Sequence, residues 1–279
     1  MAALCFNTMN ESTYLGCPLS LAAQIDAAAA AGFPLIGIDM FTLDSWLGTG
    51  RTLQELADLL ASRDMACWEL AAAIDLGTDD DPIEAAHKAA RAAAVLKPKW
   101  VQGNIRLPFG RSALELFDRV SAIVNKVGPR VALEYLPWLP VKDIASARAY
   151  VDHVGLDRAG VLVDSWHHFR GPDTYADLES LPLDHIAYVQ FDDALPMVSG
   201  DLLNETVNRR TFPGGGEFDL TGFCSRLTDK GFDGVVSLEI LSDEWRGNDI
   251  GEFAERVYQS STRYWGTSGA DPAHERNGL

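Results

Sequence analysis

The sequence is short of cysteine and of positive charge, and each shortage argues against a class of protein. The four cysteines, Cys5, Cys17, Cys67 and Cys224, are scattered and form no CxxC pair. Neither a zinc framework nor a disulfide framework is expected, and such thiols fit a reducing cytoplasm. Lys and Arg number 23 against 40 Asp and Glu, which gives a formal net charge of −17. Because nucleic acids and anionic membranes attract clustered basic residues, neither is an expected partner.

Long apolar stretches and a secretion signal are also missing. The sequence has no run of 18 apolar residues, so no transmembrane helix is expected. Residues 1–13 place no basic segment ahead of an apolar stretch, which argues against a signal peptide. No GxGxxG turn follows the first apolar run at 2–8, as a dinucleotide-binding open sheet would prefer. The composition, 47% hydrophobic and 23% charged, is that of a folded globular protein.

Short apolar runs alternate with longer amphipathic stretches along the chain. The apolar runs predict strands over residues 2–8, 34–40, 66–73, 99–105, 130–136, 160–165, 185–191 and 234–241. The stretches between them predict helices over residues 21–32, 52–64, 81–96, 112–127, 141–154, near 175–178, 218–231 and 252–265.

Eight strand–helix units predict the fold class. Such alternation implies a parallel sheet covered by helices. The size of the repeating part fits a single-domain (β/α)8 TIM barrel over residues 1–265, with a doubly wound open sheet as the alternative. Residues 266–279 are polar and contain several glycines, so a flexible C-terminal tail is expected there.

Each of the last four predicted strands carries one polar residue near its end. These are Glu134, Asp164, Gln190 and Glu239. In a barrel the C-terminal strand ends carry the chemistry, so the four side chains are expected to converge. Three carboxylates and an amide oxygen suit a hard cation such as Mg2+ or Mn2+, and the lack of sulfur disfavours structural zinc. The simpler alternative is that each is an ordinary polar group satisfied by Arg or Lys neighbours.

Five segments in the second half of the chain resemble a known family. They are ALEYLPW (132–138), GVLVDSWHHFRG (160–171), YVQFDDA (188–194), RTFPGGGEFDL (210–220) and GFDGVVSLEIL (231–241). In order and spacing they are similar to the xylose isomerase-like TIM-barrel superfamily, and more closely to its sugar phosphate isomerase/epimerase branch. That branch also holds inosose dehydratases, hydroxypyruvate isomerases and 3-dehydroshikimate dehydratases. The first half of the chain agrees only in its alternating pattern.

The resemblance implies a metal site and two acid–base groups. Glu134, Asp164, Gln190 and Glu239 would hold one divalent ion, Mn2+ or Mg2+, with Co2+ as a further candidate. Glu134 and Glu239 would also transfer protons. His167 matches the histidine of a D-[ST]-x-H motif, which would contact substrate and take part in catalysis. Gln190 stands where many relatives carry histidine.

Other residues match substrate-binding positions, each with a simpler alternative. Arg210 matches an arginine that holds substrate oxygens, or it forms a surface ion pair. Trp138 and Trp166 would form an apolar wall for a sugar, or only cap the barrel. The glycines at 214–216 suggest a turn more than a phosphate cradle, and Gly215 replaces the glutamate of the common PGEG pattern.

Three further side chains next to these positions are given structural or supporting roles. Asp192 and Asp193 are a second pair of ligands or, more simply, supporting or solvated groups. His168 follows His167 directly, so the two side chains diverge and at least one is expected to be structural.

These residues predict proton transfer next to a carbonyl group. A divalent cation polarises the carbonyl, and two glutamates facing the adjacent carbon exchange its proton through an enediolate. We expect a metal-dependent isomerase or epimerase of a sugar, keto-sugar or cyclitol. A dehydratase (lyase) of the inosose or 3-dehydroshikimate type uses the same groups, and a non-catalytic sugar- or partner-binding subunit is a third hypothesis. The expected partners are a small carbohydrate or cyclitol and, as in many relatives, further copies of the chain. An abasic-site endonuclease is disfavoured by the net charge and by only six histidines.

Overall fold

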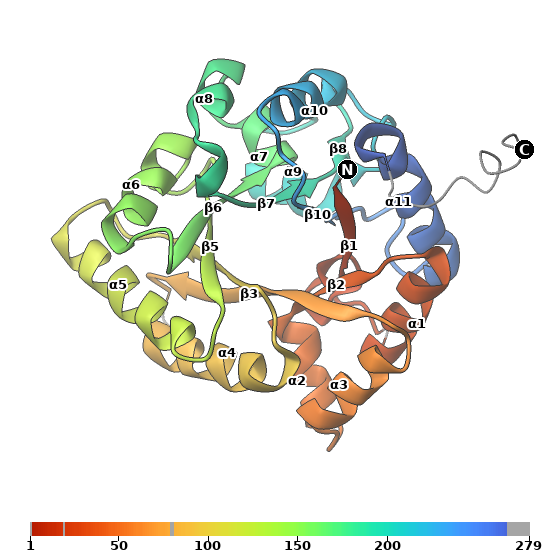
Figure 1. Ribbon diagram of the computed structural model, residues 1–279. Helices are drawn as coiled ribbons and strands as arrows, with labels where there is room; N and C mark the ends of the chain where they lie inside the picture. Colours follow the sequence, from red (N-terminus) through yellow and green to blue (C-terminus); the bar gives the residue numbers. More distant parts are fainter. Residues whose placement is uncertain (1, 19, 79–80, 267–279) are drawn as a thin grey trace, which may run out of the picture.

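Eight parallel strands close into a barrel with helices around it (Figure 1). The computed structural model describes residues 2–18, 20–78 and 81–266. The strands follow one another around the barrel in the order β1-β10-β7-β6-β5-β4-β3-β2. Their bounds are β1 Ala3–Asn7, β2 Leu35–Asp39, β3 Ala66–Leu76, β4 Trp100–Ile105, β5 Arg130–Glu134, β6 Ala159–Asp164, β7 Ile186–Phe191 and β10 Val235–Leu238. The short strands β8 (Asp193–Ala194) and β9 (Arg210–Thr211) form a separate antiparallel pair.

The helices form the outer layer, as Figure 1 shows. Their bounds are α1 Leu21–Ala31, α2 Met40–Gly48, α3 Leu53–Ala61, α4 Pro82–Leu96, α5 Arg111–Asn125, α6 Ile144–Val154, α7 Ser165–Arg170, α8 Tyr175–Ser180, α9 Leu202–Asn208, α10 Leu220–Asp229 and α11 Ile250–Trp265. Three 3-10 turns lie in the connections, at Thr8–Glu11, Thr13–Leu15 and Leu183–His185.

Local capping signals set helix ends, and one of them shapes the site. Ser20 accepts a hydrogen bond from the N–H of Ala23 at the start of α1, and Gly32 ends that helix with a φ of 99°. Asp164 both ends β6 and caps α7, because its side chain accepts from the N–H of His167. This cap fixes His167 above the end of β6.

The barrel confirms the single-domain (β/α)8 architecture expected from the alternation. Three helices were not predicted. One of them, α2, follows β2 with no turn between them, and the other two, α7 and α9, have 6 and 7 residues, too few to show a helical period. Strand β3 was predicted to end at residue 73 but continues to Leu76. Its pairing with β4 shifts register between Leu70 and Ile74, and Ala72 in this stretch has a φ of 49°.

Of the tail expected at 266–279, residues 267–279 lie outside the described residues. Across the described ranges, no helix has both the length and the apolar character needed to span a bilayer.

The strand period places a polar layer directly above an apolar one inside the barrel. A small apolar cluster, separate from the main core between barrel and helices, contains Trp100, Ala132, Leu162 and Tyr188. Side chains two positions apart lie on the same face of a strand. The next residue on that face is therefore polar on each strand: Gln102, Glu134, Asp164 and Gln190. The apolar layer closes the barrel below, and the polar layer forms the floor of a site at its C-terminal end.

Candidate active site and metal centre

Two carboxylates and one histidine meet at the ends of β5 and β6. Glu134 ends β5 and Asp164 ends the neighbouring β6. His167 Nε2 lies 3.2 Å from Glu134 Oε1 and 4.0 Å from Asp164 Oδ2. All three side chains are buried, and each offers a ligand atom within 4.8 Å of the other two. This group could hold a metal ion.

The other two predicted ligands belong to the next two strands around the barrel. Gln190 lies in β7, and Glu239 directly follows the last residue of β10. Gln190 Nε2 and Asn7 Nδ2 each donate to Glu239 Oε1 over 3.3 Å. Gln190 Oε1 is buried and has no hydrogen-bond partner among the described residues. The close three-residue group does not include Glu239. The structure thus gathers two of the four predicted ligands with His167 and holds the other two as a bonded pair.

The donor set fits a divalent cation. A buried acceptor without a partner is uncommon in proteins, and the Oε1 of Gln190 is such an atom beside several carboxylates. Carboxylate and amide oxygens suit Mg2+ and Mn2+, whereas the imidazole of His167 adds affinity for later transition metals. The residues present could therefore hold a divalent ion, and their mixed donors fit more than one metal.

Two amides that the sequence analysis missed hold Glu134. Gln102 Nε2 donates to Glu134 Oε2 over 2.9 Å, and Asn104 Nδ2 donates to the same oxygen over 2.8 Å. The Gln102 amide is itself oriented, because its Oε1 accepts the N–H of Ala72 over 2.8 Å. The signal was present in the sequence as two polar residues at alternate positions of the 99–105 run.

Arg210 is buried in the centre of the site, so its interpretation as half of a surface ion pair is wrong. Its Nη1 donates to Asp164 Oδ2 over 2.9 Å and pairs with Asp192, and it lies 3.4 Å from Glu239 Oε2. Its Nη2 donates to Thr206 Oγ1 over 2.8 Å. The guanidinium thus joins three carboxylates, and α9 anchors it through Thr206.

The carboxylates around Arg210 differ in their ionisation. Burial works to raise the pKa of Asp164, but the charge of Arg210 and the contacts with His167, including its backbone N–H, outweigh burial and hold that pKa below its usual range. Burial, with the charge of Asp164, raises the pKa of Asp192 well above its usual range despite Arg210. Burial likewise raises the pKa of Glu239, with Glu134 and Asp164 adding to it and Arg210 opposing it.

Asp193 holds the glycine turn and is buried, so its interpretation as a solvated group is wrong. Its Oδ2 accepts the N–H groups of Gly214 and Gly216, each over 3.0 Å, and its Oδ1 accepts that of Phe218 over 3.0 Å. A Cβ at Gly216 would collide with Asp193 Oδ1 and the Ala194 carbonyl. These turn N–H groups are occupied by the chain's own carboxylate, which leaves a turn and no phosphate cradle.

The two tryptophans and the second histidine pack around His167. Trp138 and His167 have ring centroids 5.5 Å apart, and Trp166 lies 5.4 Å from His167 and 6.2 Å from Trp138. Trp166 is buried, whereas Trp138 is half-buried. His168 points elsewhere, with its ring 5.8 Å from Tyr175 and 5.5 Å from Phe223, and burial lowers its pKa to about 4. His168 is thus the structural member of the pair.

One further buried carboxyl, on β3, was missed. Glu69 Oε1 accepts from Asn7 Nδ2 over 3.4 Å and from Ser237 Oγ. Glycine is needed opposite it, because a Cβ at Gly37 would collide with the Glu69 side chain. Burial raises the pKa of Glu69 to about 7, with donation from Ser237 opposing the rise. Through Asn7, Glu69 is linked to Glu239.

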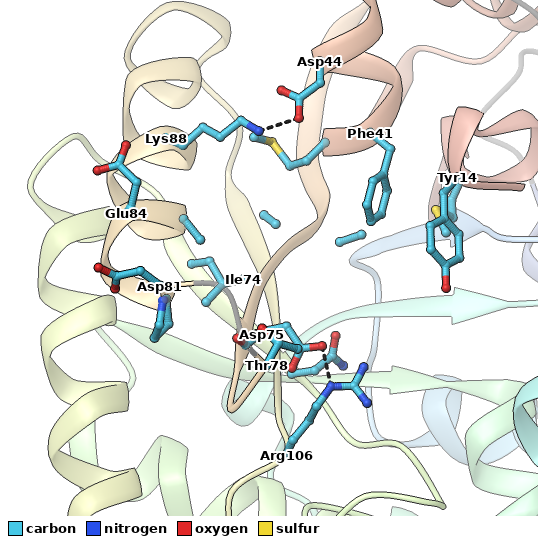
Figure 2. Close-up of a pocket in the computed structure, with 17 residues that line it drawn as sticks. Tyr14, Phe41, Asp44, Ile74, Asp75, Thr78, Asp81, Glu84, Lys88 and Arg106 are labelled. Carbon is cyan, nitrogen blue, oxygen red and sulfur yellow. Dashed lines mark hydrogen bonds and ion pairs between the residues drawn. The ribbon is translucent and has the colours of Figure 1, made fainter.

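A cavity of about 640 Å³ opens beside this centre, around the ends of the first four strands. Figure 2 shows the ion pairs Lys88–Asp44 and Arg106–Asp75 in its wall. Tyr14 and Phe41 stack at its edge, with ring centroids 4.8 Å apart. Asn104, which binds Glu134, is also part of the lining. The cavity and the candidate centre therefore share a wall.

Two curated relatives match about half of the chain. An inosose isomerase of Halalkalibacterium halodurans is 31% identical over 137 residues, which are 48% of this chain and 48% of that protein. A 3-dehydroshikimate dehydratase of Pseudomonas putida is 33% identical over 126 residues, 44% of this chain and 19% of that protein. The chain thus spans about half of the isomerase and about a fifth of the dehydratase.

Solved structures and a family model match much more of the chain. The IolI protein, solved with a bound zinc atom, superposes with a TM-score of 0.82 at 22% identity, over 94% of this chain and 98% of that chain. A D-allulose 3-epimerase from Methylomonas sp. in complex with D-allulose gives a TM-score of 0.71 at 18% identity, over 94% and 97%. At these identities the superpositions show the fold. The model of xylose isomerase-like TIM barrels matches residues 25–265. Because this match covers most of the sequence, the chain belongs to the xylose isomerase-like TIM barrel family.

Proposed function

We propose that this protein is a divalent-metal-dependent isomerase or epimerase of a sugar, keto-sugar or cyclitol. The observation that carries the proposal is the buried group of Glu134, Asp164 and His167 at the C-terminal end of the barrel. Relatives that act as inosose isomerase or as ketose epimerase agree with this class of reaction.

The proposed ligands are Glu134, Asp164, Gln190 and Glu239, with Mn2+ or Mg2+ as the ion and Co2+ as a further candidate. The unpaired Oε1 of Gln190 supports its place in the set. Bound there, the cation would polarise the carbonyl group of a keto substrate.

Glu134 and Glu239 are the proposed proton-transfer groups. Gln102 and Asn104 hold Glu134 Oε2, which leaves Oε1 as the atom that accepts a proton from the carbon next to the carbonyl. Glu239, on the neighbouring part of the same strand arc, is the group that would give a proton back. Return to the opposite face of that carbon gives epimerisation. Return to the carbonyl carbon, while the hydroxyl proton of the first carbon passes to the former carbonyl oxygen, gives isomerisation.

His167, Arg210 and the two tryptophans are proposed to act on the substrate. His167 presents Nε2 next to Glu134 Oε1, where it can donate to a substrate oxygen. Arg210 supports the centre by keeping Asp164 ionised. The substrate contacts expected of Arg210, Trp138 and Trp166 stay predictions.

A dehydratase is the second candidate, because the same two glutamates can serve it. Glu239 could pass the proton to a leaving hydroxyl group instead of to carbon, and one relative is a dehydratase. A non-catalytic binding subunit is the third. Further copies of the chain stay predicted partners, and the four free cysteines agree with the proposed cytoplasmic location.

The first experiment is metal stoichiometry by elemental analysis after dialysis against Mn2+ or Mg2+. We expect about one ion per chain in the wild type and clearly less in Glu134→Gln and Glu239→Gln. Glu115→Gln is the matched control, because Glu115 pairs with Arg111 on the exposed face of α5. No bound metal in the wild type would contradict the proposal.

The second experiment separates the candidate reactions. Uptake of deuterium from solvent into D-allulose or an inosose, without loss of water, marks an isomerase or epimerase. Release of water marks a dehydratase. Metal binding with neither outcome in any substrate leaves the binding subunit.

A further inference from the structure

We propose that the cavity beside Glu134 selects an uncharged polyhydroxylated substrate and rejects phosphorylated or carboxylated ones. The inference rests on the proposed function and narrows its substrate class. It depends on three observations: the continuity of the cavity with the catalytic centre, the charge of its wall, and its aromatic edge.

Asn104 makes the cavity part of the same site. Its side chain lines the cavity, and its Nδ2 donates to Glu134 Oε2 over 2.8 Å. Ala72, another lining residue, donates its N–H to the amide of Gln102, which holds the same carboxylate. A molecule whose reacting carbon faces Glu134 therefore extends its remaining atoms into this space.

The wall of the cavity carries an excess of two negative charges. Its ionisable lining residues are the acids Asp44, Asp75, Asp81 and Glu84 and the bases Lys88 and Arg106. Both bases are already paired: Lys88 Nζ lies 2.5 Å from Asp44 Oδ2, and Arg106 Nε lies 2.7 Å from Asp75 Oδ2. Figure 2 shows both pairs in the wall. Of the two remaining acids, Glu84 pairs with Arg91 over 2.9 Å, outside the lining. A phosphate or carboxylate would therefore meet no unpaired cation among the lining residues and would be repelled by the acidic side chains beside it.

The rest of the lining suits a polyol. Tyr14 and Phe41 stack at 4.8 Å and present an apolar surface on which the C–H face of a sugar or cyclitol can pack. The amide oxygen of Asn104 and the hydroxyl oxygen of Thr78 offer acceptors to substrate hydroxyl groups. The volume, about 640 Å³, lies within the usual range for small-molecule sites.

The competing interpretation makes Arg106 an anchor for an anion. Its side chain is about two-fifths exposed, and Nε is the atom that faces Asp75. An anionic substrate would then have to bind beside the Asp75 carboxylate, which already neutralises the same guanidinium. This cost falls on anions alone, so Asp75 is the residue that decides between the two interpretations.

The test compares the binding of matched ligands by calorimetry, in the presence of Mn2+. The uncharged ligands are D-allulose and an inosose, and the anionic ligands are D-allulose 6-phosphate and 3-dehydroshikimate. We expect the wild type to bind the best uncharged ligand at least about tenfold more tightly than either anion. Asp75→Asn should tighten the binding of the anions about tenfold, because one negative charge is lost and Arg106 is released. Asp118→Asn, on the outer helix α5, makes the same change of net charge away from the cavity. It should change the affinity neither for the uncharged nor for the anionic ligands.

Equal or tighter binding of an anion by the wild type would overturn the inference, and so would binding of no ligand at all. An effect of Asp118→Asn as large as that of Asp75→Asn would show that only the net charge matters and would also overturn it. Deuterium uptake tests the proposed function separately. A chain that exchanges deuterium into a phosphorylated ketose disproves the inference and leaves the isomerase proposal standing.

Discussion

Arg210 donates from Nη1 to Asp164 Oδ2 over 2.9 Å, and both side chains are buried. The same Nη1 pairs with Asp192 and lies 3.4 Å from Glu239 Oε2. One guanidinium thus compensates the negative charge that three strand ends bring into the barrel. Because unpaired charges in a buried site are costly, the geometry of the centre depends on this arginine as much as on the candidate ligands.

Replacing Arg210 should therefore destabilise the fold as well as the site. Arg210→Met leaves buried carboxylates uncompensated, and we expect the free energy of unfolding to fall by about 3–5 kcal/mol. Arg210→Lys keeps the charge but loses the bonds of Nε and Nη2 to Thr206, so its loss should be smaller. Urea denaturation at pH 7 measures both. Arg111→Met, which breaks the exposed Arg111–Glu115 pair, should cost less than about 1 kcal/mol. Equal losses at the two arginines would refute this account.

The two aspartates bonded to Arg210 should respond differently to the same substitution. The pKa of Asp164 is held low by Arg210 and His167, whereas burial raises the pKa of Asp192. Burial opposes the charge of Asp192, so removing that charge should cost little. The amide of Asp192→Asn can still bond Ser165 and Arg210, and we expect a loss of about 1 kcal/mol or less. Asp164→Asn removes a charged partner and should cost about 3 kcal/mol. Urea denaturation of both variants at pH 7 is the measurement, and a larger loss at Asp192 would reverse the assignment of charge.

Glu69 should make stability fall as the pH rises. Burial raises its pKa to about 7. In the unfolded chain the carboxyl titrates near about 4.3, so the native state holds the extra proton between these values. The stability that Glu69 contributes is complete below about pH 4.3, and it falls by about 1.4 kcal/mol per unit until the folded pKa is passed. By pH 8 the total loss approaches about 4 kcal/mol, of which about 3 kcal/mol falls between pH 5 and pH 8.

Glu69→Gln stays neutral and has no such loss. Relative to the wild type, the variant should be more stable at pH 8 than at pH 5 by up to about 3 kcal/mol. Urea denaturation of both proteins at the two pH values measures this difference. A difference that does not change with pH would show that the Glu69 carboxyl is ionised in the folded protein across that range.

The sequence predicted the barrel because its signal is distributed over the whole chain. Eight apolar runs at regular spacing identify eight strands even when the ends of single elements are misplaced, as at β3. Glu134, Asp164, Gln190 and Glu239 could be found for a related reason, since each is a polar residue within or at the end of an apolar run.

The partners of those residues could not be found in the same way. Asn7 and Arg210 are both bonded to Glu239, yet they lie 232 and 29 residues away from it in the sequence. The strands β8 and β9 and the helix α9 decide whether the arginine before the glycine turn points to solvent or into the barrel. These elements have only 2 to 7 residues, so they leave no periodic signal in the sequence. The burial of Arg210, and with it the charge balance of the centre, is therefore a property of the tertiary structure.

Gln102 is expected to position Glu134 for metal binding. The Ala72 N–H fixes Gln102 Oε1, so Nε2 must face Glu134 Oε2, and Glu134 Oε1 is left toward His167. Gln102→Leu removes this support without touching a proposed ligand. Loss of a group that orients a ligand usually weakens metal binding 10–100-fold, and we expect Mn2+ affinity, measured by calorimetry, to fall by about that factor. Ala72→Gly keeps the N–H and relieves the φ of 49°, so affinity should be retained. Gln54→Leu, on the exposed face of α3, is the matched control. If Gln102→Leu binds Mn2+ as the wild type does, Asn104 alone is enough to hold Glu134.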